Sequence, residues 1–309
     1  MKFDKILLSL ALSVLAAVSA AAQSDESMGF SRIVRDPASA AMGFTGKASD
    51  AAPAWASFSN AAMLPLGSVS GAAGLSWQSW APQTLRSSNI SAGLSYRFGI
   101  VGLTLGFASQ QEEKYEMIDE VGMPTGFFTP SDMVFGGGIG VLLAPGFSLG
   151  ANARFLSSTV TADDKYTAFG VDFLAAYRLG GMTLTAGVTN LGGSVDDSRS
   201  QSFHIPGSVT FAGEYRTVLA EEHGLRADVD ADWFLASRAI TLGAGAEYDF
   251  RKCVFVRAGY HYGSEEAVLP SFVTFGLGGQ FKGIRLDLAF LTGNDALGNT
   301  LTLGLGYSF

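Results

Sequence analysis

The chain ends in Asn299–Phe309, NTLTLGLGYSF, and this stretch decides the fold. From Leu301 to Phe309 every odd position is large and apolar, whereas the even positions between them are threonine, glycine or serine. Alternation with a period of two is typical of a β-strand with two unlike faces. Chain ends usually fray into solvent, so a last strand that stays apolar and aromatic throughout is expected to have a partner strand.

The same alternation recurs along the chain and predicts fourteen strands. They are expected at residues 69–80, 87–97, 100–110, 133–144, 147–158, 166–179, 182–191, 207–217, 224–235, 239–250, 253–262, 271–281, 284–293 and 299–309. Tight turns such as Phe98-Gly99, Arg251-Lys252 and Lys282-Gly283 alternate with longer loops such as 111–132 and 192–206. Short turns at one end, longer loops at the other and an even strand count are typical of outer-membrane barrels.

Composition narrows the class of protein. The 309 residues include 39 Gly, 23 Phe and 9 Tyr, and only 16% are charged, whereas soluble domains carry nearer a quarter. The net charge of −8 and the absence of a basic patch exclude nucleic acid as an expected partner. The single cysteine, Cys253, excludes an internal disulfide and disfavours a cysteine-based zinc site, and no cofactor or metal is expected.

Residues 1–22 are predicted to be a signal peptide. Lys2 and Lys5 precede an apolar run from residue 6 to 18, and Ala20–Ala22 supplies the small residues of a cleavage site. No later stretch of ~20 apolar residues could span a membrane as a helix. Because a membrane-spanning chain must pair all its backbone groups internally, a closed barrel is the remaining solution.

The sequence therefore predicts an all-β fold, a transmembrane antiparallel up-and-down barrel formed by residues 67–309. It would lie in the bacterial outer membrane with outer-membrane lipid around it. Aromatic residues near the strand ends, such as Trp77, Tyr96 and Tyr248, fit interfacial girdles. A soluble β-sandwich is the alternative, but so many strands would need a more charged outer surface.

The last strand carries a second expectation. It must pair with the first strand to remove both sheet edges. Its apolar positions Leu305, Tyr307 and Phe309 also resemble the terminal signal by which the barrel-assembly machinery recognises outer-membrane proteins. This resemblance implies that the machinery is a partner.

Residues 23–66 do not alternate and are rich in Ser, Ala and Gly. One short helix is expected from Pro37 to Ala41, ended by Gly43, and a second from Pro53 to near Leu64. Such a segment would either plug the lumen or lie below it in the periplasm.

This segment also carries a family resemblance. Asp36-Pro-Ala-Ser-Ala-Ala-Met-Gly43, Asp50 and Asn60-Ala-Ala-Met-Leu64 together resemble the entry segment of the PorV/PorQ family, which is related in fold to the fatty-acid channel FadL. Family members usually have Met-Gly-Gly and Asn-Pro-Ala, where this chain has Met-Gly-Phe and Asn-Ala-Ala. The resemblance implies a fourteen-stranded barrel that binds cargo or attachment-complex proteins in type IX secretion.

Catalytic and metal motifs are weak. Gly146–Gly150 matches G-x-S-x-G, but Ser148 lies in an alternating strand with no helix after it, unlike a hydrolase nucleophile. The glycines at 136–140 are expected to permit bending or close approach within the sheet. Asp228, Asp230 and Asp232 share one strand face without the glycine of a calcium loop. They are predicted to pair with inward arginines, with cation binding as the lesser alternative, and no enzyme activity is expected.

The loop 111–132 displays Tyr115, Met117, Phe127 and Phe128 among acidic residues. These four side chains are predicted to bind a partner protein, unless the loop folds inward over the barrel mouth. The favoured function is therefore a non-enzymatic barrel that binds secreted cargo or secretion-system proteins. The alternative is a FadL-like channel for hydrophobic small molecules, which is disfavoured because most inward positions are Gly, Ser, Thr or charged.

Overall fold

A computed structural model describes residues 26–81, 84, 86–119, 121–162, 164–196, 202–295 and 297–309. The predicted signal peptide lies outside these residues. None of the helices within them has both the length and the hydropathy to cross a membrane.

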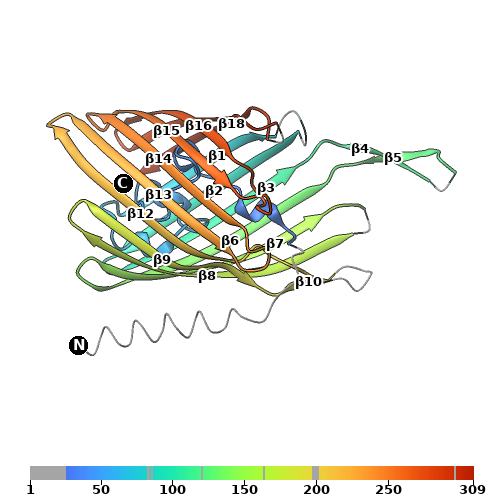
Figure 1. Cartoon of the computed structure of the whole chain (residues 1–309), viewed down its shortest axis with the longest axis horizontal. Helices are drawn as coiled ribbons and strands as arrows, with labels where there is room; N and C mark the ends of the chain where they lie inside the picture. The colour runs from blue at the N-terminus through green and yellow to red at the C-terminus, as the bar shows by residue number, and fades with distance from the viewer. Residues whose placement is uncertain are drawn as a thin grey trace.

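Fourteen antiparallel strands form a closed barrel (Figure 1). They are β1 (Gly71–Trp80), β2 (Ser87–Phe98), β3 (Val101–Gln111), β6 (Ser131–Ala144), β7 (Phe147–Thr159), β8 (Lys165–Leu179), β9 (Met182–Gly192), β12 (Ser208–Ala220), β13 (His223–Phe234), β14 (Ile240–Phe250), β15 (Val254–Gly263), β16 (Phe272–Phe281), β17 (Ile284–Thr292) and β18 (Thr300–Ser308). Each strand end lies within three residues of its predicted position. The predicted fold class is confirmed.

Two small hairpins lie inside segments that were predicted as loops. One pairs β4 (Tyr115–Ile118) with β5 (Pro124–Phe128), and the other pairs β10 (Ser194–Asp196) with β11 (Ser202–His204). Strands of three to five residues are too short to establish a period of two in the sequence, so the prediction missed them.

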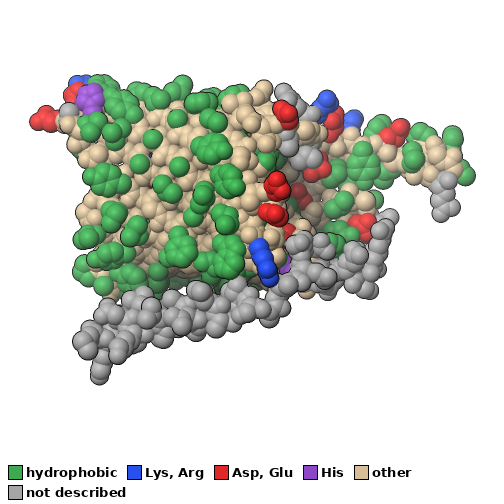
Figure 2. Space-filling model, viewed as in Figure 1, with side chains coloured by type: hydrophobic (Ala, Val, Ile, Leu, Met, Phe, Trp, Pro, Cys, Tyr) green, Lys and Arg blue, Asp and Glu red, His purple; other side chains and the backbone are tan. Residues whose placement is uncertain are grey.

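The wall has one apolar and one polar face, as predicted. In β18, Leu303, Leu305 and Tyr307 are 40–50% exposed, whereas Thr300 and Thr302 are fully buried in the lumen. Hydrophobic side chains cover the outer wall in Figure 2, and acidic side chains gather near the end that carries the long loops. The outer face thus has the composition of a surface in lipid.

The C-terminal residue is held by the first strand. β18 pairs with β1 from Ser308 opposite Ala72 to Leu301 opposite Ser79. The backbone N–H groups of Ser70 and Gly71 donate to the Phe309 carbonyl at 2.9 and 3.0 Å, and the Phe309 N–H donates to the Gly71 carbonyl at 2.9 Å. The last residue is therefore paired, which removes both sheet edges.

The segment before β1 lies inside the barrel (Figure 1, blue) and is called the plug here, residues 26–67. It contains η1 (Gly29–Arg32), α2 (Pro37–Ala40), η2 (Pro53–Trp55) and η3 (Ala61–Met63). The predicted helix from Pro53 to Leu64 is wrong, because it is broken into η2 and η3. Asn60 adopts an extended conformation between them, and its side chain accepts a hydrogen bond from the Ala62 N–H.

Candidate functional site

Side chains fill the lumen in two layers. An apolar layer lies near the long loops, and a charged layer lies nearer the short turns. The apolar layer joins the plug to inward strand residues close to the long loops. Its members are Met28, Phe30, Ile33 and Phe44 of the plug with Trp80, Ala108, Val134, Leu156, Phe272, Ala289 and Leu291 of the wall. Each of these wall residues is an inward position of its strand.

Aromatic rings form the centre of this apolar layer. Phe44 contacts Phe272 edge to face, with ring centroids 4.9 Å apart, and the Trp80 ring is 6.3 Å from Phe44. The His261 ring stacks on Phe272 at 4.7 Å. Most inward positions were expected to be Gly, Ser, Thr or charged, and the end of the lumen near the loops departs from this pattern because it is apolar.

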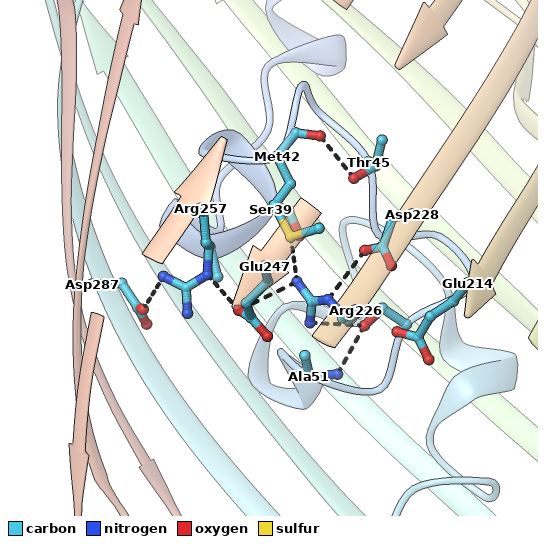
Figure 3. A network of polar contacts seen from close by, with 12 residues as sticks. Ser39, Met42, Thr45, Ala51, Glu214, Arg226, Asp228, Glu247, Arg257 and Asp287 are labelled. Carbon is cyan, nitrogen blue, oxygen red and sulfur yellow. Dashed lines mark hydrogen bonds and ion pairs between the residues drawn. The ribbon is translucent and has the colours of Figure 1, made fainter. Parts of the chain in front are cut away.

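The charged layer is a chain of ion pairs across neighbouring strands (Figure 3). Arg226 lies 3.5 Å from Asp228 and 3.6 Å from Glu247, and Arg257 pairs with Glu247 at 2.5 Å and Asp287 at 2.8 Å. All five side chains are almost fully buried. Charges removed from water are tolerated when each has an opposite partner, so the predicted pairing of Asp228 with an inward arginine is observed.

Two other carboxylates, one on the wall and one on the plug, form ion pairs that hold the plug in place. Asp232 of β13 accepts from Lys47 of the plug at 2.6 Å and pairs with Arg32 at 3.0 Å. Asp50 of the plug pairs with Arg178 at 3.0 Å and with Arg216 at 2.7 Å. These ion pairs connect the plug to β8, β12 and β13.

The three aspartates of β13 therefore have separate roles. Asp228 pairs with Arg226, Asp230 accepts from the Lys47 N–H at 3.2 Å, and Asp232 binds plug cations. Within the described ranges, no group of three or more His, Cys, Asp or Glu side chains is arranged to hold a metal ion.

Glycines of the wall make room for the plug backbone. A Cβ on Gly259 would collide with the Gly43 nitrogen and the Met42 carbonyl carbon, and one on Gly140 would collide with the Ala61 carbonyl. The glycine run at 136–140 thus serves close approach to the plug as well as to neighbouring strands. The sequence suggested close approach but could not name this partner.

The motif residues that resemble the PorV/PorQ entry segment have structural roles in the plug. Asp36 caps α2 by accepting from the Ser39 N–H at 2.8 Å. Gly43 has φ +72°, a conformation that glycine adopts without strain. Burial raises the pKa of Asp36 and the nearby Asp287 raises it further, whereas Arg285 and the bonds from Ser39 oppose this shift.

Ser148 is fully buried and donates to the Ala62 carbonyl of the plug at 2.6 Å. Its hydroxyl therefore anchors the plug. The G-x-S-x-G match lies at the end of a β-turn and within β7, without the strand-to-helix elbow that a hydrolase nucleophile requires.

Two cavities lie along the plug. One, of about 110 Å³, lies beneath the apolar layer and reaches Phe44, His261 and Leu269. The other is a vestibule of about 1050 Å³ that reaches the short turns at Glu222 and Lys252. The two cavities share five of their lining residues, Asp36, Ala51, Ala52, Trp55 and Arg226.

The predicted partner-binding residues lie on the β4–β5 hairpin, which extends away from the end of the barrel in Figure 1. Tyr115 and Phe128 face each other across the two strands, with ring centroids 5.8 Å apart. Phe127 is 64% exposed and Met117 is half-buried. The structure thus places all four residues on one hairpin that does not fold over the barrel mouth, but Phe127 pairs with Glu116 and lies on the opposite face from Tyr115 and Phe128.

The residues of the predicted assembly signal lie on the lipid-facing wall at the turn end. Leu305 and Tyr307 point outward from β18, and Phe309 packs against Tyr307 and Tyr96. This position is accessible from the membrane, and recognition by the assembly machinery stays a prediction.

Comparison with known proteins rests on shape. No family model and no curated protein sequence matches the chain. The solved toluene transporter TodX of Pseudomonas putida aligns with a TM-score of 0.61 and 15% identity, over 93% of this chain and 99% of TodX. The fold is that of a FadL-like outer-membrane barrel.

Two further structures support this assignment of fold. The toluene transporter TbuX of Ralstonia pickettii has a TM-score of 0.59 at 15% identity, covering 88% of this chain and 97% of TbuX. A FadL homologue of Pseudomonas aeruginosa has a TM-score of 0.57 at 11% identity, covering 93% and 100%. The predicted outer-membrane location is confirmed, and TodX and TbuX are named as toluene transporters.

Proposed function

We propose that this FadL-like barrel is a channel for hydrophobic small molecules. The observation that carries the proposal is the succession of an apolar layer, a cavity of about 110 Å³ and a vestibule of about 1050 Å³ along the plug. A hydrophobic solute would leave water at the apolar layer, where burial of apolar area contributes ~25 cal/mol per Å². It would then reach the vestibule on the short-turn side.

The step between the two cavities defines the gate of the proposed channel. Ala51 and Ala52 of the plug line both cavities, next to Trp55 and Arg226. Because the Ala51 and Ala52 side chains are small, only a small part of the plug must move to open a path at this junction. Passage would require movement of the Ala51–Ala52 segment, while Asp50 and Lys47 stay bound to the wall through their ion pairs.

The solved neighbours agree with this function. TodX and TbuX are described as toluene transporters and CymD as a monoaromatic hydrocarbon channel. At 15% identity or less, these structures support a shared architecture, and the substrate class remains part of the proposal.

The test is uptake of a radiolabelled aromatic hydrocarbon into proteoliposomes. Ala52→Phe should fill the junction and reduce the uptake rate about tenfold or more, equivalent to a barrier increase of ~1.4 kcal/mol. Ala52→Ser is the matched control and should leave the rate unchanged. If liposomes with the unmodified protein take up no more hydrocarbon than empty liposomes, the channel function is wrong.

A second candidate function is protein binding by the β4–β5 hairpin, in line with the PorV/PorQ resemblance. Ile118, Val121, Met123 and Phe127 are each at least 61% exposed beyond the barrel, and exposed apolar clusters of this kind mark contact surfaces. Each side chain buried against secreted cargo would contribute ~1.5–3 kcal/mol, reduced by the cost of ordering the hairpin.

Deletion of residues 113–129 separates the two functions. Under the protein-binding function, the deletion abolishes co-purification of a secreted or attachment-complex protein while the barrel remains inserted. Loss of uptake together with unchanged co-purification would reject the hairpin as a protein-binding site and would favour the channel function.

A further inference from the structure

The lipid-facing wall has a groove that shares four lining residues with the vestibule, namely Leu75, Asp287, Gly304 and Leu305. The groove, of about 770 Å³, crosses β16, β17, β18, β1 and the edge of β2. Its side chains include Leu75, Trp77, Leu277, Leu286, Leu303 and Leu305, which are each at least 40% exposed. These residues point outward from the barrel, so the groove faces the membrane.

The floor of the groove is a glycine that no side chain covers. Gly279 pairs with Val254 and Leu286, which both point outward. A Cβ on Gly279 would meet nothing closer than the Cys253 carbonyl oxygen, at 4.0 Å. A void in an apolar wall forfeits dispersion contacts, so something from the membrane is expected to fill it.

The other outward-facing glycines offer a contrast. A Cβ on Gly137 would meet Leu105 at 3.2 Å, and one on Gly213 would meet Leu184 at 3.6 Å. In both places a neighbouring leucine already covers the glycine. The uncovered position is therefore a particular property of the wall around Gly279.

Two lysines lie in the turns next to Gly279, outside the lining of the groove, and Lys252 also lines the vestibule. Lys252 lies in the turn that precedes β15, and Lys282 lies in the turn that follows β16. These two strands are adjacent. The Gln280 N–H donates to the Cys253 carbonyl at 2.8 Å, which fixes the two turns side by side. Lys282 lies 5.4 Å from the centre of the exposed Phe281 ring.

Both lysines are free to bind an anion. No carboxylate among the described residues forms an ion pair with either ammonium group, whereas the neighbouring Arg251 is paired with Glu222. Gly279 is two residues from the closing pair Phe281–Ile284, a rise of ~7 Å along the strand. The turn that contains Lys282 therefore begins about 7 Å along the strand from Gly279.

We propose that this groove binds one acyl chain of a phospholipid with an anionic headgroup, and that Lys252 and Lys282 bind its phosphate. The outward leucines contact the chain, Gly279 makes room for it, and the two ammonium groups select the charge. Short turns face the periplasm in outer-membrane barrels, so the lipid belongs to the periplasmic leaflet.

Native mass spectrometry of the detergent-released protein tests headgroup selection. Phosphatidylglycerol and phosphatidylethanolamine with identical acyl chains are the probes, and the unmodified protein should retain more phosphatidylglycerol. Lys252→Gln and Lys282→Gln should each lower phosphatidylglycerol binding about fivefold, because each lysine near a membrane surface contributes roughly that factor. Phosphatidylethanolamine carries the same phosphate with an ammonium group beside it, so its weaker binding should fall by a smaller factor. Lys114→Gln, on the β4–β5 hairpin, is the matched control.

A second variant tests the groove itself. Gly279→Leu has room for its side chain and should lower the binding of both lipids, whereas Gly213→Leu, elsewhere on the lipid face, should not. Different mobility of boiled and unboiled samples verifies that each variant is folded. Equal retention of the two lipids by all variants would overturn the proposal. A dimer that Gly279→Leu converts to monomer, with lipid binding unchanged, would instead assign the groove to a second copy of the chain.

Discussion

The inner and outer faces of the barrel wall both contain glycine, but for different reasons. On the inner face, Gly259 and Gly140 lie against the plug backbone. On the outer face, a Cβ on Gly213 would meet one leucine, and a Cβ on Gly279 would meet only the Cys253 carbonyl oxygen, at 4.0 Å. A small residue on the inner face therefore marks the position of another chain segment, whereas on the outer face it leaves a depression for lipid or a neighbouring side chain.

The same contrast applies to charge. The buried ion pairs of the inner face connect strands and plug, as between Asp232 and Lys47. The exposed pair of Arg86 with Glu113 lies at the loop end, with both side chains about 60% exposed. Buried pairs are costly to break because a lone charge remains out of water, whereas exposed pairs contribute little.

The largest effect is expected from Asp232→Ala. This change leaves Lys47 and Arg32 without their carboxylate partner in the lumen, and removal of one member of a buried pair costs about 3–5 kcal/mol. Denaturant unfolding in detergent, followed by tryptophan fluorescence, measures the loss of unfolding free energy. Glu113→Ala is the control and should cost less than ~1 kcal/mol. Equal losses for the two variants would contradict the contrast between the faces.

A smaller effect is expected from Gly259→Ala. The added methyl group meets the plug backbone at Met42 and Gly43, and overpacking of this kind costs ~1–3 kcal/mol. Limited proteolysis should cut the plug faster in this variant than in the unmodified protein. Gly213→Ala, which adds the same group to the outer face, should leave the rate of cleavage unaltered. Faster cleavage in both variants would show that the plug is not the partner of the inner glycines.

The smallest effect concerns the outer face itself. Leu305→Asp places a carboxylate on the lipid-facing side of β18, where a charged residue costs up to ~2–4 kcal/mol for a cation at mid-membrane and less for an acid. Deletion of Phe309 removes the backbone pairing with Gly71. Both variants should lower the amount of folded barrel in outer-membrane fractions, as measured by heat-modifiable migration. Normal levels of both would argue against a role of the last strand in assembly.

Much of the fold could be predicted because one rule repeats. Alternation with a period of two, as in Leu301–Phe309, locates each strand and its two faces without knowledge of distant contacts. The β4–β5 hairpin could not be predicted in this way, because four or five residues do not establish a period. The break at Asn60 was missed because a side-chain cap, not a change in hydropathy, begins the second helical turn, η3.

The candidate site was harder to predict for a physical reason. Gly, Ser and Thr at inward positions fit either a water-filled lumen or a lumen filled by a plug, and the sequence alone does not distinguish them. Ser148 illustrates this, because its hydroxyl donates to the plug carbonyl of Ala62. The apolar layer was missed because its members, such as Phe44, Trp80 and Phe272, come from distant parts of the chain.

The central claim is that a hydrophobic molecule enters the lumen through the apolar layer. The most direct measurement is photolabelling of the purified barrel with a diazirine derivative of an aromatic hydrocarbon, followed by peptide mass spectrometry. The account predicts that labels on peptides containing Phe44 and Phe272 disappear when excess unlabelled hydrocarbon is added, whereas labels on the lipid-facing wall remain. Labelling that is confined to the lipid-facing wall or to the β4–β5 hairpin would contradict the claim.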